Sequence, residues 1–240
     1  MANDGWRSTR QLAVHEEMDA ADVDAAALRR ALLFIRRVNA ALGYTRATLR
    51  HLDRLAVAVP TDRPLRVLDV ATGSADVPTA ILKWAEQQRR EVEVVGLDLH
   101  ARTLAIAAEQ AGDRLWLVRG NALALPFADG AFDIAMTSMF LHHLPTDVAV
   151  AALREMDRVA RVGVIAADLV RSRRAYAWIT LFTLTSPPMI RHDARVSVKQ
   201  AFTLTEAEAI CRAAGLGDAV VHKHFGHRFV IAGAKRYAGR

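Results

Sequence analysis

Apolar residues along this chain form two alternating patterns, namely short continuous runs and longer stretches with helical spacing. The runs are rich in valine, isoleucine and leucine, which is typical of strands buried on both faces of a parallel sheet. They lie at residues 67–70, 92–97, 115–118, 132–138 and 162–169. Helices are expected directly after the first strand and at residues 102–110 and 146–160. This alternation predicts a doubly wound α/β sheet.

Two more strands are expected near the end of the chain, at residues 218–224 and 227–234. They would form a hairpin around Phe225-Gly226. Before this hairpin, Thr205 and Glu208 have the spacing of a helix capping box. The hairpin raises the expected number of strands to seven.

The N-terminal quarter shows helical periodicity without strands. Asp24 is positioned to cap a helix that reaches residue 42, Gly43 interrupts it, and a second helix is expected over residues 45–59. We therefore expect a flexible N-terminus at 1–20, a helical cap at 21–60, and a main domain at 61–240 with a lid insertion at about 171–200. The alternative for the cap is a helical extension that only packs or dimerises.

The stretch at residues 66–98 has the layout of a nucleoside site. A strand leads into the small residues 71–75, a helix with Asp76 as its expected N-cap follows, and the second strand ends in Asp98. An acid about 20 residues past such a turn commonly binds ribose hydroxyls. A dinucleotide, however, needs a glycine where Asp76 stands, because a carboxylate there would repel pyrophosphate. The pattern favours a cationic or zwitterionic nucleoside over NAD.

Asp69-x-Ala71-x-Gly73-x-Ala75, followed by Asp98, resembles the first two motifs of class I S-adenosylmethionine (SAM) methyltransferases. The usual glycines are replaced by alanine at Ala71 and Ala75.

Two later segments extend the resemblance over residues 66–234. Gly-Asn-Ala at 120–122, with Leu-Pro-Phe at 125–127, resembles the adenine-binding segment of the family, and Asn121 stands at the position of the usual acid. Phe-Asp-Ile at 132–134, with Leu-His-His-Leu at 141–144, resembles its fourth-strand motif.

The resemblance implies a Rossmann-like sheet of order 3-2-1-4-5-7-6, with the last strand antiparallel. It also implies SAM as the methyl donor, S-adenosylhomocysteine as the product, and no metal. The cofactor-binding residues expected from it are Asp69, Ala71, Thr72, Gly73, Asp98, Leu99, Asn121, Ala122, Ser138 and Met139.

Catalysis is expected to involve His142 and His143, which follow the fourth strand where the reactive methyl group should lie. A histidine with a pKa near 6.5 suits a general base. A phenol, with a pKa near 10, would need such a base at neutral pH. The alternative is that these histidines cap the following turn or pack in the core.

The acceptor is expected to be small, hydrophobic or aromatic. The predicted acceptor-binding residues are Tyr44, Trp178, Phe182, Arg191 and His192, with Phe34 also available. The segment at 191–193 is expected to be either a lid facing an anionic substrate or an ion-paired loop. Similarity to methyltransferases of quinone and polyketide metabolism favours a phenolic oxygen as the methylated atom, with carbon methylation of a quinol ring as the alternative.

A net charge of +6 keeps an RNA methyltransferase under consideration. The arginines are spread over helix faces, however, and Ser-Met-Phe-Leu at 138–141 replaces the Asn/Asp-Pro-Pro-Tyr motif of amino methylation. We therefore do not expect nucleic acid to be a partner. A non-catalytic SAM-binding protein remains an alternative, and a homodimer is possible.

Localisation is expected to be cytoplasmic. The single cysteine, Cys211, allows no internal disulfide. The first twenty residues lack an apolar signal-peptide core, and the apolar run at 175–184 is too short to span a bilayer.

Overall fold

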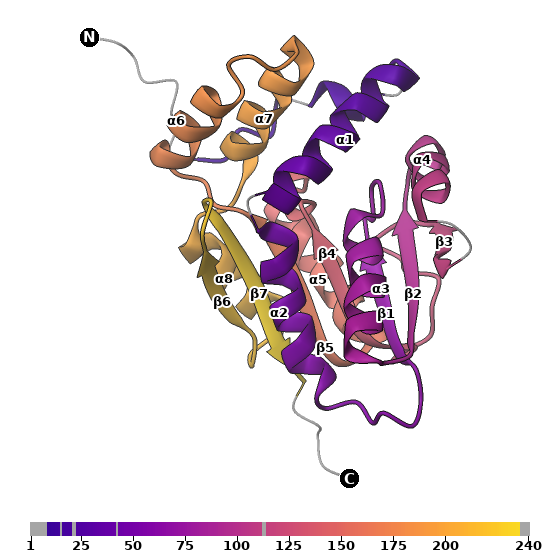
Figure 1. The fold of residues 1–240 in the computed structure, drawn as a ribbon. Helices are drawn as coiled ribbons and strands as arrows, with labels where there is room; N and C mark the ends of the chain where they lie inside the picture. The colour runs from indigo at the N-terminus through magenta and orange to yellow at the C-terminus, as the bar shows by residue number, and fades with distance from the viewer. Residues whose placement is uncertain (1–8, 15, 21–22, 42, 112–113, 236–240) are drawn as a thin grey trace.

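The computed structural model describes residues 9–14, 16–20, 23–41, 43–111 and 114–235. Its centre is a seven-stranded sheet in the order β3-β2-β1-β4-β5-β7-β6 (Figure 1). The strands are β1 (Leu65–Val70), β2 (Val92–Asp98), β3 (Trp116–Arg119), β4 (Phe132–Ser138), β5 (Ala160–Leu169), β6 (Val220–His224) and β7 (Arg228–Ala234). The first five are parallel, and β7 is antiparallel to both its neighbours, β5 and β6. The expected strand order is confirmed.

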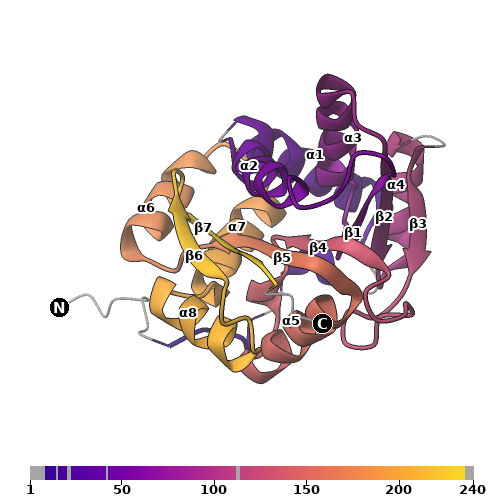
Figure 2. The same cartoon turned by 90° about the horizontal axis from the view of Figure 1, so that it is seen from below.

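Helices cover both faces of the sheet (Figure 2). They are α1 (Ala25–Ala41), α2 (Tyr44–Ala56), α3 (Asp76–Gln88), α4 (Ala101–Ala111), α5 (Thr146–Val159), α6 (Arg173–Phe182), α7 (Pro188–Gln200) and α8 (Leu204–Ala213), with short 3-10 turns η1 (Glu17–Asp19) and η3 (Leu141–His143). Apolar side chains of α2 and α3 pack with one face of the sheet, and those of α5 and α8 pack with the other. None of the described helices combines the length and hydropathy that a membrane crossing needs.

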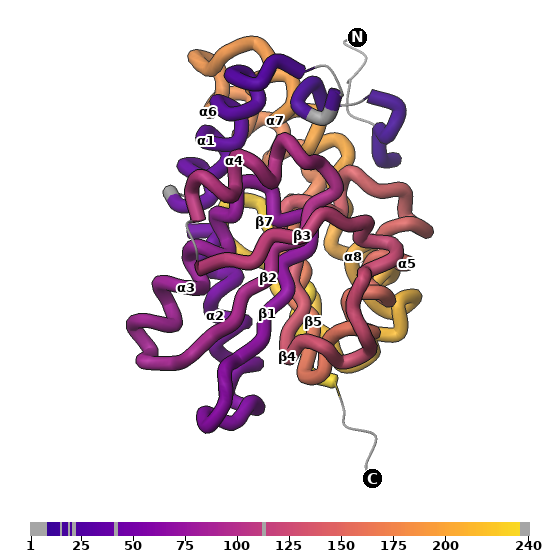
Figure 3. The backbone as a smooth tube through the Cα atoms, turned by 90° about the vertical axis from the view of Figure 1, so that its right-hand side faces the viewer, coloured from indigo at the N-terminus to yellow at the C-terminus, as the bar shows by residue number. Residues whose placement is uncertain are grey.

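The two helices of the expected cap have different positions. Helix α2 contacts β5 and β7 and is part of the main core, whereas α1 groups with α6 and α7 at one end of the sheet (Figures 1 and 3). The N-terminal segment, described at residues 9–14 and 16–20, is bound to α7. Gln11 N donates to Lys199 O (3.3 Å), and Arg10 Nε donates to Gln200 O (2.6 Å).

Two predicted caps differ from the structure. Helix α3 is preceded by Ala75 as its N-cap, at φ 57°, so Asp76 lies inside the first turn. The capping box of α8 is formed by Thr203 and Glu206, two residues before the predicted pair. The chain contains two Thr-x-x-Glu sequences, and the buried Arg171 selects the first by pairing with Glu206.

The segment at 191–193 is helical, so the expected lid or ion-paired loop is not a loop. Pro187 is the N-cap of α7 and Pro188 its first residue. Proline suits this position because the first helical N–H has no partner within the helix. The expected cap of α1 is confirmed, since Ala27 N donates to Asp24 Oδ1 at 2.8 Å.

The aspartate of the fourth-strand motif has a structural role. Asp133 is at the amino end of β4, where it accepts two hydrogen bonds from the Arg63 guanidinium (2.7 Å each) and one from Arg66 N (3.0 Å). We expect Asp133→Asn to lower the free energy of unfolding by about 1–3 kcal/mol, because a buried charged hydrogen-bond acceptor is lost. Urea unfolding measures this.

The matched control for that experiment is Asp129→Asn. Asp129 is 81% exposed in its pair with Arg158, so a change of at most about 0.5 kcal/mol is expected. Equal effects of the two substitutions would contradict the structural role of Asp133.

Candidate active site

A cavity of about 820 Å³ lies where the carboxyl ends of β1, β2 and β4 meet α1, α6 and α7. Its floor is polar and is built by loops that follow the strands. Its roof is apolar and is built mainly by α1. Ligands of open α/β sheets bind at this edge, because the loops after parallel strands converge there.

The loop between β1 and α3 makes a tight turn on the cavity floor. Ala71, Gly73 and Ala75 have positive φ values of 57°, 54° and 57°, a conformation that costs alanine about 1 kcal/mol or more. Thr72 fixes the turn, since its N–H donates to Leu97 O (2.9 Å) and its hydroxyl to Asp69 Oδ2 (2.7 Å). Apart from Gly73 and its two chain neighbours, no heavy atom of the described residues lies within 4 Å of where a Cβ on Gly73 would be, so the turn is open to a ligand.

Asp98 connects this turn to the end of β2. Its Oδ2 accepts from Gly73 N and its Oδ1 from His100 N, each at 3.0 Å. The side chain lines the cavity and is only 7% exposed, and this burial raises the pKa of Asp98. Each carboxylate oxygen retains a second lone pair, so Asp98 can accept further hydrogen bonds from a ligand.

Asp69 lies behind the turn and is fully buried. Its Oδ1 has no hydrogen-bond partner among the described residues. Burial raises the pKa of Asp69 to about 8, despite the hydrogen bond from Thr72, and the charges of Asp76 and Asp98 add to the increase. The carboxyl group is therefore mostly protonated at neutral pH and can respond to a cation.

Asp69 is therefore the one predicted cofactor residue outside the cavity lining, which includes Leu99, Asn121, Ala122, Ser138 and Met139 as well as the turn and Asp98. Leu99 is 54% exposed, which leaves an apolar face free for a flat ring. Asn121 Oδ1 accepts from Leu123 N (2.9 Å), and its exposed side chain borders the same space.

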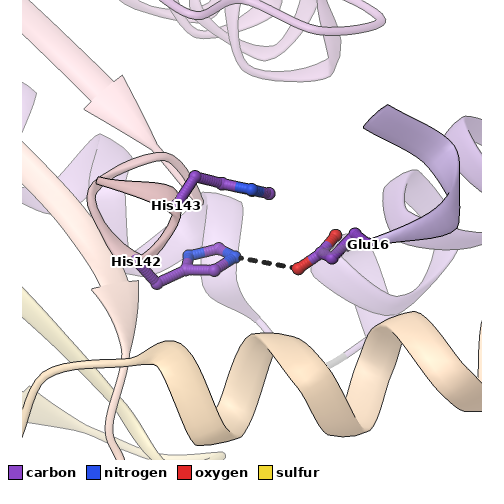
Figure 4. A group of neighbouring side chains, drawn as sticks. All are labelled: Glu16, His142 and His143. Atoms are coloured by element: carbon purple, nitrogen blue, oxygen red, sulfur yellow. Dashed lines mark ion pairs between the residues drawn. The ribbon is translucent and has the colours of Figure 1, made fainter. Parts of the chain in front are cut away.

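His142 is buried at the cavity edge between two carboxylates. Its Nδ1 is 2.7 Å from Asp168 Oδ1, and its Nε2 is 3.5 Å from Glu16 Oε1 (Figure 4). Burial alone would lower the pKa of His142, but the charges and hydrogen bonds of Asp168 and Glu16 raise it to about 10. His142 is thus an imidazolium at neutral pH and a hydrogen-bond donor, which differs from the neutral base expected from the sequence.

Glu16 reaches this site from the N-terminal segment and is held there by α7. The Ser197 hydroxyl donates to its carboxylate, and Asp193 accepts from Glu17 N (2.8 Å) and Met18 N (3.1 Å). Burial would raise the pKa of Glu16, but the interactions with His142, His143 and the Ser197 hydroxyl together outweigh it and lower the pKa.

The ring of His143 lies beside that of His142, with 4.2 Å between the ring centroids. Both rings and the Glu16 carboxylate line the cavity, and Figure 4 shows all three side chains directed toward one another.

Glu16 and Asp168 were not among the site residues predicted from the sequence. Asp168 could have been found, because it lies near the end of β5 as Asp98 lies at the end of β2. Glu16 carries no such signal, since its contact with His142 joins segments far apart in the chain.

The structure does not bring the five predicted acceptor-binding residues to the cavity. Tyr44 is in the core with the Arg228 guanidinium 4.1 Å from its ring centroid, and Trp178 stacks on Phe182, which is 44% exposed. Arg191 and His192 line a separate cavity of about 410 Å³.

Phe34, which the sequence also offered for the acceptor, lies in the apolar roof of the main cavity. The other side chains of this roof are Leu28, Leu32, Ile35 and Val38 of α1, with Ile179 of α6 and Ile190 of α7. Helix α6 thus turns Ile179, not the neighbouring Trp178, toward the cavity.

Comparison with solved structures supports the fold. Human N-acetylserotonin methyltransferase, solved with SAM, has a TM-score of 0.65 at 13% identity and aligns with 88% of this chain and 56% of its own. An O-methyltransferase structure from Nostoc punctiforme has a TM-score of 0.58 at 20% identity, over 85% of this chain and 60% of its own. The fold is that of class I SAM-dependent methyltransferases.

Sequence comparison supports the same class. Residues 67–163 match a family described as a methyltransferase domain, and the resemblance seen in the motifs is confirmed. The demethylmenaquinone methyltransferase of Lactiplantibacillus plantarum is 38% identical over 40% of this chain and 41% of its own. That of Anoxybacillus flavithermus is 32% identical over 53% of each. The chain therefore spans about half the length, or less, of these curated relatives.

Proposed function

We propose that the protein transfers a methyl group from SAM to a hydroxylated ring of a small, largely apolar acceptor, most directly to a phenolic oxygen. One observation carries the proposal. The turn at residues 71–75, Asp98, the apolar roof of α1, His142 and Glu16 all line one cavity. We call the part of this cavity under the roof, next to His142 and Glu16, the apolar chamber. A nucleoside site and an acceptor site that share one space are what a direct transfer between two bound molecules requires.

The residues on the cavity floor fit SAM. Asp98 would accept from the ribose hydroxyls, Asn121 and Ala122 would border the adenine, and Asp69 would respond to the ammonium group. The unpartnered Oδ1 of Asp69 and the open space at Gly73 are the structural observations behind this fit. When bound, SAM supplies a methyl group on a positively charged sulfur.

Residues of the chain itself would orient the acceptor and place a positive charge next to its oxygen. The imidazolium of His142 would donate a hydrogen bond to the acceptor oxygen and favour its ionised form. The roof of α1 would exclude water, which strengthens this interaction. These contributions apply equally to a phenol that is methylated on oxygen and to a quinol whose ionised oxygen activates a ring carbon.

Carbon methylation of a quinol ring is the second candidate, and the names of the curated relatives favour it. Both candidates can be tested together with SAM that carries a ¹³C methyl group and a panel of alkylated phenols and quinols. We expect a labelled product with a mass increase of one methylene group. The carbon chemical shift then separates a methyl ether from an aryl methyl group. SAM binding without transfer to any panel member, or to small amines and RNA, would contradict the proposal and favour a non-catalytic binding protein.

SAM binding at pH 7 is expected to release close to one proton. Because the pKa of Asp69 is about 8 in the empty protein, its carboxyl group is mostly protonated, and a nearby ammonium group would lower that pKa and expel the proton. Calorimetry in two buffers with different ionisation enthalpies measures the released proton. Asp69→Asn should abolish the release, and an unchanged release in that variant would remove Asp69 from the site.

A further inference from the structure

We propose that Glu16, His142 and His143 form a binding site for the ring hydroxyl of the acceptor, in which Glu16 is a catalytic residue that accepts the hydroxyl proton. This inference rests on the proposed function and assigns a role to a segment outside the methyltransferase motifs.

The spacing of the two central atoms suits a bound oxygen. His142 Nε2 and Glu16 Oε1 are 3.5 Å apart, which is longer than a good hydrogen bond between nitrogen and oxygen. A ligand oxygen placed between them could lie about 2.8 Å from both atoms, which is a hydrogen-bond distance in each case. Both side chains line the cavity, so such an oxygen could enter from the apolar chamber.

Both groups are fixed before any ligand arrives. Asp168 accepts from the backbone N–H of His142 at 3.0 Å and pairs with its ring. Glu16 is 5% exposed, and its carboxylate accepts a hydrogen bond from the Ser197 hydroxyl. The Asp193 carboxylate accepts hydrogen bonds from the backbone N–H groups of the next two residues, Glu17 and Met18. Preorganised donors and acceptors lose little entropy when a ligand binds.

The pair recognises a group that both accepts and donates. An imidazolium can only donate, and an ionised carboxylate can only accept. A hydroxyl satisfies both, whereas a methyl ether has no hydrogen to donate and leaves the buried carboxylate with only the Ser197 hydroxyl as donor. The site therefore distinguishes an unmethylated acceptor from its methylated product.

The same geometry provides a base for the proton that the acceptor hydroxyl loses during methyl transfer. As the acceptor oxygen becomes nucleophilic, its O–H bond breaks and the proton forms a bond to Glu16 Oε1. The electron pair stays on the acceptor oxygen, facing the positive charge of His142. Glu16 afterwards returns the proton to solvent.

The test is a binding cycle that needs no turnover. The probes are 4-butylphenol and its methyl ether, 4-butylanisole, and the proteins are the full chain, Glu16→Gln and the control Glu17→Gln. Glu17 is adjacent but exposed, and only its backbone contacts Asp193. We expect the wild type and Glu17→Gln to prefer the phenol. Glu16→Gln should lose about ten- to hundred-fold of that preference, the range of one charged hydrogen bond.

Two further measurements make the result decisive. Thermal unfolding shows whether each variant is folded, and Glu16→Asp, which withdraws the carboxylate by one methylene, should also lose preference if Glu16→Gln is unstable. SAM affinity, measured on the same samples, separates the two proposals. A protein that binds SAM but shows the same phenol preference with and without the Glu16 carboxylate would overturn this inference alone, whereas a wild type that binds no SAM would overturn the proposed function.

Discussion

Replacing Asp98 with alanine is expected to weaken SAM binding about ten- to hundred-fold, because charged hydrogen bonds to the ribose are worth about 1.5–3 kcal/mol. The substitution also removes the acceptors of Gly73 N and His100 N. The turn at Ala71 and Ala75 would then lose part of the support for its left-handed backbone. Isothermal calorimetry with SAM measures the effect directly.

Asp62→Ala is the control for that experiment. Asp62 is an exposed carboxylate before β1 and does not line the cavity, so its replacement should leave the dissociation constant unchanged. If Asp98→Ala binds SAM as tightly as the wild type, Asp98 does not contact the cofactor.

A second large effect is expected at His142. His142→Ala should lower kcat by about 10²–10³, the cost of removing a preorganised donor from a developing oxyanion. Steady-state kinetics on an acceptor identified in the panel measure it, while SAM affinity stays close to that of the wild type. His192→Ala, on an exposed histidine outside the main cavity, is the control.

The pH dependence tests the charge state of His142. Its pKa is raised to about 10, so the donating imidazolium is complete at neutral pH and is lost as pH rises through about 10. Activity should therefore show no loss near pH 6.5 that depends on His142. A drop in activity as pH falls through 6.5, absent in His142→Ala, would show that His142 is a neutral base instead.

The arrangement of the sheet could be predicted from the sequence because each strand is a local apolar run. The position of Asp98 followed from the same logic, since an acid at the end of a buried strand must lie at the sheet edge. A tight turn at residues 71–75 was also predictable from its small residues, although only Gly73 adopts its positive φ without strain, whereas Ala71 and Ala75 adopt it at a cost.

Helix register was harder to predict. The capping box of α8 begins at Thr203 because Glu206 pairs with Arg171, a contact across 35 residues that no local pattern contains. Likewise, Pro187 and Pro188 begin α7, although prolines also commonly follow the end of a helix.

The residues that line the apolar chamber were the hardest to predict from the sequence. Aromatic residues such as Trp178 and Phe182 suggested a binding surface, but they do not line the cavity, and its roof is formed by Phe34 and aliphatic residues of α1. Which face of a short helix is turned inward depends on tertiary packing. The pairing of Glu16 with His142 depends on the same packing and has no local signature.

The most direct test of the central claim is a crystal structure of the protein with S-adenosylhomocysteine. We predict the nucleoside in the cavity of about 820 Å³, with its ribose against Asp98 and its homocysteine over the turn at residues 71–75. A cavity filled by side chains, or a nucleoside bound elsewhere on the protein, would contradict the assignment.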